Sequence, residues 1–296
     1  MRGLDLRGKT VLLTGCNSGL GLETLRQFGR AGARIIALAR SEEKARDACT
    51  EAGLLLDDRS AVRAVACELS QPSSVRSCVE AVRSDDTLLD VVLCNAGIIG
   101  SPRLKQSFGY EMHFFTNHIG HFMLVRGLLD RLSDSARVVV VSADAHWLAP
   151  KGGIDFDNLS GERGYNRYVA YAQSKLANIL FAKELARRFS GTRLTANALH
   201  PGVIRTQLLR NMSGWSNGVI RLIEPLLLKS VEQGAATQCY VAAHPDTAST
   251  TGQYFKHCDI ARARRVTDDA ALAAQLWDTS EAIVRELADG ASGASP

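Results

Sequence analysis

Tyr171 and Lys175 are the two side chains whose types and spacing most directly indicate chemistry. On a helix, residues four positions apart project from the same face, so the phenol and the ammonium would lie side by side. A phenol with its ordinary pKa of about 10 exchanges protons poorly at neutral pH. A neighbouring ammonium favours the phenolate and lowers the phenol pKa. The pair therefore predicts a group that gives a proton to, or takes one from, a substrate oxygen.

A glycine-rich segment, residues 14–21, follows the first predicted strand and opens the first predicted helix. Gly15 can form the tight turn, Gly19 lets the backbone approach a phosphate, and Gly21 permits close packing of helix on sheet. Free amides at the helix start would then face a pyrophosphate. The spacing is Gly-x-x-x-Gly-x-Gly, which differs from the common dinucleotide fingerprint. The segment predicts a dinucleotide site, and the alternative is a flexible turn that contains glycines by chance.

The end of the second predicted strand bears on the choice of cofactor. An acidic residue there would bind a ribose 2′-hydroxyl and select NAD. This chain has Leu38-Ala39-Arg40-Ser41 instead, and the Arg40 guanidinium suits a 2′-phosphate. We therefore expect NADP, the alternative being that Arg40 is only a solvated residue at the strand end.

The composition excludes several classes of protein. The hydrophobic fraction of 46% and the charged fraction of 22% are those of an ordinary globular protein. The net charge is 35 − 31 = +4 without a long basic run, so nucleic-acid binding is not expected. Seven cysteines, without a Cys-x-x-Cys pair, indicate no metal site and no disulfide framework. A reducing compartment, the cytoplasm, fits such cysteines. Residues 1–9 hold no apolar stretch, and no uninterrupted apolar run reaches membrane length, so we expect no signal peptide and no membrane segment.

Short apolar runs alternate with longer amphipathic stretches along the chain, which predicts repeated strand–helix–strand units. Strands are expected over 10–14, 34–38, 62–67, 89–94, 137–142, 193–199 and 252–256. Helices are expected over 19–31, 41–53, 73–83, 106–132, 168–189, 231–243 and 268–287. The predicted α/β architecture is a single-domain Rossmann fold: a doubly wound parallel sheet of about seven strands with helices on both faces. We expect the domain over residues 1–288 and a disordered tail over 289–296.

Several segments together resemble the short-chain dehydrogenase/reductase family. They are residues 14–21, Cys94-Asn95-Ala96-Gly97, Asn117, the Tyr171/Lys175 pair and His200-Pro201-Gly202. Within that family, three further runs resemble the retinol-dehydrogenase-like branch. They are Asn117-His118-Ile119-Gly120-His121-Phe122, residues 171–178, and Gln233-Gly234-Ala235-Ala236-Thr237.

The resemblance implies roles for individual residues. Tyr171 would be the proton donor or acceptor, and Lys175 would lower its pKa and bind the nicotinamide ribose. Asn117 would hold a water in a proton relay. The residues that would bind NADP are Gly15, Asn17, Ser18, Gly19, Leu20, Gly21, Arg40, Glu68, Leu69, Asn95, Ala96, Gly97, Tyr171, Lys175, Pro201, Gly202, Val203 and Thr206. Glu68 stands where the family usually has Asp. The histidines at family positions, His118, His121 and His146, are expected to be structural.

The chain departs from the family at its fourth catalytic residue, a serine that hydrogen-bonds the substrate oxygen. Alignment on Ala145-His146 places Ala143 at that position. Because side chains alternate along a strand, Ser142 should point away from the cleft. Loss of one such donor typically costs about 10²–10³ in rate. Three explanations stay open: a natural variant that uses Ser142 or Asp144 as a catalytic group, an engineered serine-to-alanine change, or a pseudoenzyme.

Residues 207–228 are rich in apolar side chains, Met212 and Trp215 among them. They suggest a lipophilic lid that, with Ala143 and Asp144, contacts substrate; the alternative is an amphipathic helix that packs on the domain or on a second copy in a homo-oligomer. The expected function is an NADP(H)-dependent oxidoreductase that transfers a hydride between the nicotinamide and a small lipophilic carbonyl or alcohol. The alternative, based on Ala143, is a cofactor-binding regulator or scaffold with little turnover.

Overall fold

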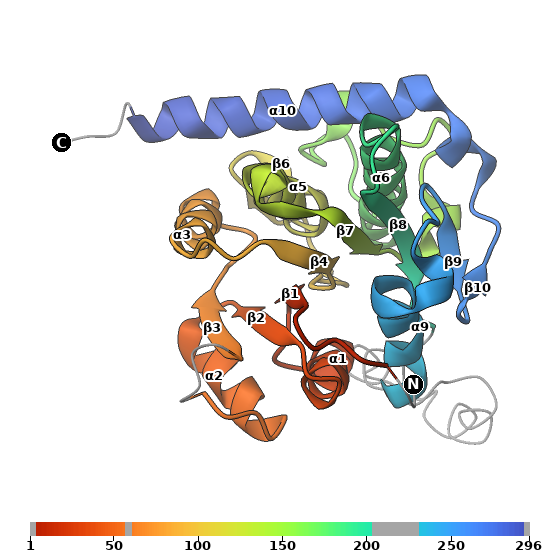
Figure 1. Cartoon of the computed structure of the whole chain (residues 1–296). Coiled ribbons are helices and arrows are strands. Elements are labelled where there is room, and N and C mark those ends of the chain that lie inside the picture. The colour runs from red at the N-terminus through yellow and green to blue at the C-terminus, as the bar shows by residue number, and fades with distance from the viewer. Residues whose placement is uncertain (1–3, 57–60, 203–230, 293–296) are drawn as a thin grey trace, which may run out of the picture.

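Eight strands form one sheet in the computed structural model, which describes residues 4–56, 61–202 and 231–292 (Figure 1). They are β1 (Thr10–Thr14), β2 (Arg34–Ala39), β3 (Val62–Ala66), β4 (Leu89–Cys94), β7 (Leu132–Val141), β8 (Thr195–His200), β9 (Tyr254–Lys256) and β10 (Asp259–Ile260). Their order across the sheet is β10-β9-β8-β7-β4-β1-β2-β3. All neighbouring pairs are parallel except β9 and β10. The predicted doubly wound parallel sheet is confirmed, with β10 added at one edge.

The central strands are largely buried because helices cover both faces of the sheet. Every residue of β1 and of β8 is buried. Helices α1 (Gly19–Arg30), α2 (Glu42–Glu51) and α9 (Val231–Ala243) cover one face, and α3 (Pro72–Arg83), α5 (Gly120–Gly127) and α6 (Arg167–Arg188) cover the other (Figure 1). Such two-sided burial explains why the strands are near-continuous apolar runs rather than alternating ones.

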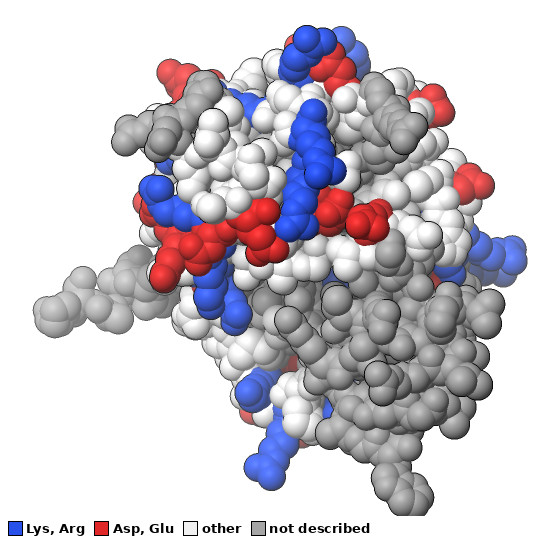
Figure 2. Space-filling view, turned by 90° about the horizontal axis from the view of Figure 1, so that it is seen from below, with Lys and Arg blue, Asp and Glu red and all other residues white. Residues whose placement is uncertain are grey.

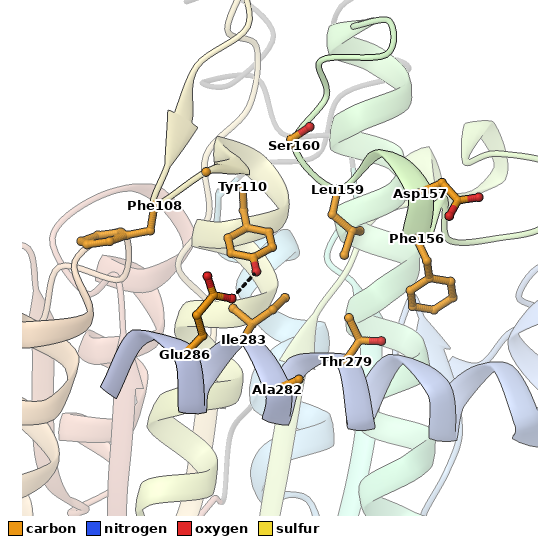
Figure 3. A pocket seen from close by; sticks show the side chains of 11 residues that line it. Phe108, Tyr110, Phe156, Asp157, Leu159, Ser160, Thr279, Ala282, Ile283 and Glu286 are labelled. Atoms are coloured by element: carbon orange, nitrogen blue, oxygen red, sulfur yellow. Dashed lines mark hydrogen bonds between the residues drawn. The ribbon is translucent and has the colours of Figure 1, made fainter. Parts of the chain in front are cut away.

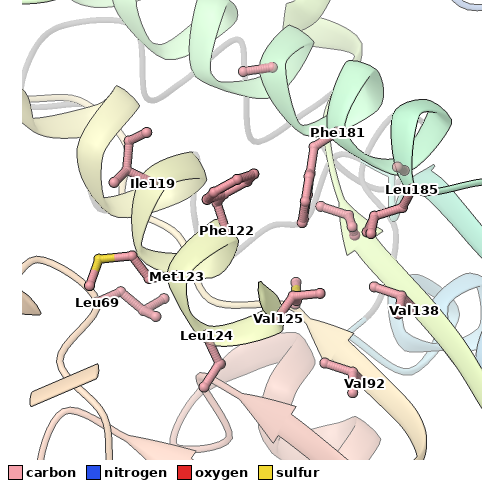
Figure 4. Close-up of a cluster of buried hydrophobic side chains, with 14 of the residues drawn as sticks. Leu69, Val92, Ile119, Phe122, Met123, Leu124, Val125, Val138, Phe181 and Leu185 are labelled. Atoms are coloured by element: carbon pink, nitrogen blue, oxygen red, sulfur yellow. The ribbon is translucent and has the colours of Figure 1, made fainter. Parts of the chain in front are cut away.

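The main apolar cluster lies between α5, α6 and the sheet (Figure 4). Phe122 of α5 and Phe181 of α6 lie with their ring centroids 5.5 Å apart. Trp277 stands edge-on to Phe122 at 4.9 Å. Trp277 belongs to α10 (Ala270–Ser292), a long helix that runs across the outside of α5 and α6 (Figure 1). This cluster fixes the position of α6, the helix that carries Tyr171 and Lys175.

Helix α10 extends the folded chain further than expected. The predicted domain end at residue 288 falls inside α10, so residues 289–292 of the predicted tail are helical. Gly290 does not end the helix, because one glycine costs only about 1 kcal/mol relative to alanine. Residues 293–296 lie outside the described part of the chain.

The single helix predicted over residues 106–132 is wrong. A hairpin of β5 (Gln106–Ser107) and β6 (Tyr110–Glu111) comes first, and its turn holds Phe108 and Gly109 at positive φ. The helical part begins only after Glu111, whose carboxylate accepts a hydrogen bond from Phe114 N (2.9 Å). It then runs as α4 (Met112–Phe114), a π-helical turn over Phe115–Ile119, and α5. The turn at Phe108 and Gly109 thus separates a short hairpin from the helical residues that follow it.

The longest described helices, α6 and α10, have 22 and 23 residues. Over the described ranges, neither they nor any other helix combines the length and the apolar character that crossing a membrane requires.

Candidate active site

The glycine segment forms a tight turn between β1 and α1. Gly15 has φ +68°, and its amide donates to the Leu38 carbonyl of β2 at 2.8 Å. A Cβ added to Gly21 would lie only 1.9 Å from the Gly15 carbonyl oxygen, so no side chain fits there. Ser18 precedes α1 in an extended conformation and does not cap the helix amides with its side chain. The turn thus has the close packing and the uncapped helix start that a bound pyrophosphate requires.

Thr14 ties this turn to the Asn95-Ala96-Gly97 segment after β4. Its hydroxyl accepts hydrogen bonds from the amides of Asn95 and Ala96, both at 2.9 Å. The Asn95 side-chain amide donates back to the Thr14 carbonyl at 2.8 Å. The two predicted nucleotide-binding segments are therefore one hydrogen-bonded unit.

Gly97 brings that unit against the predicted catalytic side chains. A Cβ added to Gly97 would lie 3.2 Å from both Asn117 Oδ1 and Lys175 Nζ. Asn117 sits in the π-helical turn, where its Oδ1 accepts from Ile98 N (2.8 Å) and its Nδ2 donates to Ser174 Oγ (2.9 Å). The glycine-rich unit, Asn117 and Lys175 therefore meet at one place.

Lys175 and Tyr171 lie on the same face of α6, but the hydrogen bond of the ammonium goes to a backbone carbonyl and not to the phenol. Lys175 Nζ donates to the Val141 carbonyl at 3.1 Å and lies 5.7 Å from the centre of the Tyr171 ring. Burial lowers the pKa of Lys175 to about 8 and raises the pKa of Tyr171 to about 12. The shift of the Tyr171 pKa is opposite to the one expected from the pair, because burial disfavours the phenolate and the ammonium binds a carbonyl.

The three histidines that match family positions, His118, His121 and His146, are buried, and each has a hydrogen-bonding partner. His121 joins Thr14 to Asn117: its Nε2 lies 2.9 Å from the Thr14 hydroxyl and its Nδ1 lies 3.0 Å from the Asn117 carbonyl. Burial lowers the pKa of His121 to about 4, so this bridge is neutral. His118 pairs with a serine of α10, and His146 Nδ1 lies 2.8 Å from the Ala143 carbonyl. The sequence did not reveal that His121 links the nucleotide turn to the π-helical turn that carries Asn117.

Ser142 is not available to a substrate. Its hydroxyl donates to the Lys175 carbonyl at 2.7 Å, and the side chain is buried. The neighbouring Ala143 is partly exposed and has an extended backbone, with φ −157° and ψ 156°. The hydroxyl of Ser142 thus anchors α6, and Ala143, which is expected at the family's serine position, has no side-chain donor.

Asp144 begins the 3₁₀ turn η3 (Asp144–Leu148). Its carboxylate accepts from Lys256 Nζ at 2.6 Å and from Tyr254 Oη at 3.2 Å, and lies 3.4 Å from His200 Nε2. Burial raises the pKa of Asp144, but Lys256, His200 and Tyr254 together outweigh burial and lower it. An ionised carboxylate only accepts hydrogen bonds, so Asp144 cannot replace a serine donor.

The residues expected at the adenine end lie beyond β2 and β3. Arg40 directly follows β2 and has an exposed side chain. Glu68 accepts from the amide and the hydroxyl of Ser70, at 3.1 and 2.9 Å, and Leu69 is buried. At the other end of the site, Gly202 has φ +102°. Asn17 is partly exposed, whereas Leu20 and Pro201 are buried. Four predicted contacts lie outside the described residues: Val203, Thr206, Met212 and Trp215.

A separate cavity of about 530 Å³ lies beneath α10 (Figure 3). It is bounded by the β5–β6 hairpin, residues 156–160 and α10, and the Tyr110 hydroxyl donates to Glu286 there at 3.1 Å. None of the predicted site residues lines it. This cavity is therefore not the predicted active site.

The distribution of charged side chains and cysteines does not indicate a further binding site in the described part of the chain. On the face shown in Figure 2, basic and acidic side chains are mixed among neutral ones. Within the described ranges, no group of three or more His, Cys, Asp or Glu side chains is arranged to hold a metal ion. All seven cysteines are free, and six of them are buried.

Comparison with known proteins decides the family. The pattern of the family described as short chain dehydrogenase matches residues 9–217 of the 296-residue chain. The chain belongs to the short-chain dehydrogenase family. Retinol dehydrogenase 14 of Mus musculus is 40% identical over 292 residues, covering 94% of this chain and 86% of its own. The chloroplastic short-chain dehydrogenase TIC 32 B of Brassica napus is 37% identical over 293 residues, covering 96% of this chain and 91% of its own.

Solved structures agree with this membership. The crystal structure of an uncharacterized protein from Mycobacterium paratuberculosis superposes with a TM-score of 0.76 at 32% identity, covering 96% of both chains. A metagenomic blue fluorescent protein in complex with NADPH has a TM-score of 0.67 at 23% identity, covering 85% of this chain and 96% of its own, and shows the fold alone. The predicted family and its retinol-dehydrogenase-like branch are confirmed.

Proposed function

We propose that this family member is an NADP(H)-dependent oxidoreductase that reduces lipophilic carbonyl compounds, with Tyr171 as the proton donor. One observation carries the proposal: Gly97, in the glycine-rich unit, lies against both Asn117 and Lys175. Residues suited to a dinucleotide therefore adjoin a tyrosine–lysine pair in which the lysine is buried and the tyrosine is partly exposed.

The residues present fit a nicotinamide dinucleotide. The Gly15 turn and the uncapped start of α1 would hold the pyrophosphate. The Gly15 carbonyl packs where a side chain of residue 21 would lie, so the absence of a side chain at Gly21 allows this close turn. The exposed Arg40 guanidinium would bind a 2′-phosphate, which favours NADP over NAD. Family structures at low identity hold either NADPH or NADH, so Arg40 rather than the fold supports this preference.

The proton chemistry follows from the state of Tyr171. The raised pKa, about 12, keeps its phenol protonated at neutral pH, which is the state that gives a proton to a carbonyl oxygen. The bound nicotinamide would supply the hydride. Lys175, with its pKa lowered to about 8, exchanges protons near neutral pH and could return one to Tyr171 through a hydroxyl or water between them.

Exposed apolar side chains support a lipophilic substrate. They occur in three short segments. One directly follows Gly97, one directly follows His146, and one ends two residues before Tyr171. Their members are Ile98, Ile99, Trp147, Leu148, Tyr168 and Val169. Apolar side chains gathered around a reactive group are typical of small-molecule sites. The relatives named retinol dehydrogenases agree with this class of substrate.

The experiment is NADPH oxidation by the purified protein against a panel of lipophilic aldehydes and ketones, with Tyr171→Phe as the matched variant. We expect turnover by the wild type, and none by Tyr171→Phe although it still binds NADPH. Turnover that survives in Tyr171→Phe would refute the role of the phenol.

A regulator or scaffold is the second candidate function. The observation that favours it is the serine position: Ala143 has no hydroxyl, Ser142 donates to α6, and Asp144 accepts only. Tight NADPH binding without turnover on any carbonyl of the panel would support this candidate over the first.

The free cysteines agree with a reducing compartment, and we propose the cytoplasm. A homo-oligomer stays a prediction from the sequence.

A further inference from the structure

The Asp144 carboxylate connects the ends of three neighbouring parallel strands. Asp144 follows β7, His200 is the last residue of β8, and Lys256 is the last residue of β9. In the sheet, His200 pairs directly with Lys256. The carboxylate lies 2.6 Å from Lys256 Nζ, 3.2 Å from Tyr254 Oη and 3.4 Å from His200 Nε2. The Asp144 carboxylate, which follows β7, thus contacts side chains from β8 and β9.

Two of these strand ends, those of β7 and β8, lead into segments of the candidate active site. Ala143, next to Asp144, occupies the family's serine position, and its carbonyl is held by His146 at 2.8 Å. His200 leads directly into Pro201 and Gly202, the turn predicted to contact the nicotinamide. The Ala143 segment and the Pro201 turn follow different strands, so their relative position depends on the contacts that connect the two strand ends.

The pair of charges is held tightly. The Asp144 and Lys256 side chains are 38% and 34% exposed, so neither is freely solvated. Tyr254 is almost fully buried, and its ring stands edge-on to the His146 ring at 5.1 Å. A partly buried carboxylate that accepts several charge-assisted or phenolic hydrogen bonds is held more rigidly than a solvated one.

We propose that Asp144, paired with Lys256, is a positioning residue that holds the Ala143 segment and the Pro201 turn in the arrangement that hydride transfer needs. This inference rests on the proposed function and extends it to residues outside the tyrosine–lysine pair. Asp144 acts through the backbone of these two segments and does not touch the reacting atoms.

The first test compares Asp144→Asn, Asp144→Glu and Lys256→Met with Glu281→Gln, a control that weakens the remote Arg126–Glu281 pair between α5 and α10 (2.7 Å). Misplacement of reacting groups by about 1 Å can cost up to about 10²-fold in rate. We expect Asp144→Asn to lower kcat by about 10-fold or more, with the KM for NADPH changed less than threefold. Asp144→Glu should recover part of the loss, and Glu281→Gln should leave kcat unchanged.

The Asp144→Asn/Lys256→Met double variant should be no slower than the slower single variant, because both changes remove one shared interaction. Additive losses, or a lower melting temperature with unchanged kcat in Asp144→Asn, would overturn the proposal and leave only a structural role.

The second test does not need turnover, so it remains decisive if the proposed function fails. Amide hydrogen exchange in Asp144→Asn should accelerate at residues 142–146 and 199–202, where the Ser142 amide now donates to the Leu199 carbonyl at 2.7 Å. The Glu281→Gln control should not change exchange there. Equal exchange in Asp144→Asn and wild type would refute the positioning role, whatever the activity of the protein.

Discussion

Ala143→Ser tests how the site stabilises the substrate oxygen. Ser142 donates to the Lys175 carbonyl at 2.7 Å, and the ionised Asp144 can only accept, so neither neighbour supplies a donor. Ala143 is partly exposed and extended, which leaves space for a hydroxyl without displacing the core. The substitution therefore adds one donor at the position where the sequence predicts the family's serine.

The expected gain follows from that single donor. One preorganised hydrogen bond to the developing oxyanion is worth about 10²–10³ in rate, or about 2.7–4 kcal/mol. The surrounding site is not shaped around a serine here, so we expect only part of this value. Ala143→Ser should raise kcat/KM by about 10- to 10²-fold, with most of the change in kcat.

The assay is NADPH consumption with the best carbonyl substrate of the panel, and Ser142→Ala is the matched control. Ser142→Ala removes the donor to the Lys175 carbonyl, so it should cost about 1–3 kcal/mol of stability. Below its melting temperature it should change kcat/KM less than threefold. An unchanged rate in Ala143→Ser together with a collapse in Ser142→Ala would refute this assignment and make Ser142 the catalytic serine.

Three further predictions concern the cofactor turn and the buried lysine. Arg40→Ala should weaken NADPH binding at least tenfold and leave NADH binding nearly unchanged in fluorescence titrations; equal effects on both cofactors would contradict the 2′-phosphate assignment. Gly21→Ala should lower the melting temperature and abolish NADPH binding, because its Cβ would lie 1.9 Å from the Gly15 carbonyl oxygen, whereas Gly152→Ala, where a Cβ meets no atom within 4 Å, should keep binding. The pKa of Lys175 falls on folding from 10.5 to about 8. At pH values between these two, the unfolded chain keeps a proton that the folded chain has lost, so the free energy of unfolding should rise with pH across this range. Lys175→Met should remove this rise in denaturant titrations at pH 8 and pH 10, and a rise of the same size in the variant would contradict the pKa shift.

The parallel core of the fold could be predicted because its strands are buried on both faces. β1 and β4 were expected over 10–14 and 89–94, the bounds that the structure has. The hairpin at residues 106–111 was missed because its strands have two residues each and Phe108 holds a positive φ that its residue type does not suggest. Gly109 is the one local sign of this turn, and a single glycine is not enough to predict a hairpin.

Features of the candidate site that depend on nearby residues in the sequence could be predicted. Strand alternation predicts that Ser142 points away from the cleft, and its hydroxyl donates to a carbonyl of α6. Contacts between distant residues could not be predicted, as with His121, which bonds to Thr14 107 positions earlier. The pKa of Tyr171 was expected to fall, but burial dominates it, and burial depends on the whole fold.

The most direct test of the central claim is hydride transfer from NADPH labelled with deuterium at the nicotinamide C4 position. After a single turnover with a lipophilic aldehyde, mass spectrometry of the alcohol product measures the label. We predict one deuterium in the product when the transferred face of the cofactor carries the label, and none with Tyr171→Phe. Absence of deuterium from the product with either labelled face would contradict the assignment of this protein as an NADP(H)-dependent oxidoreductase.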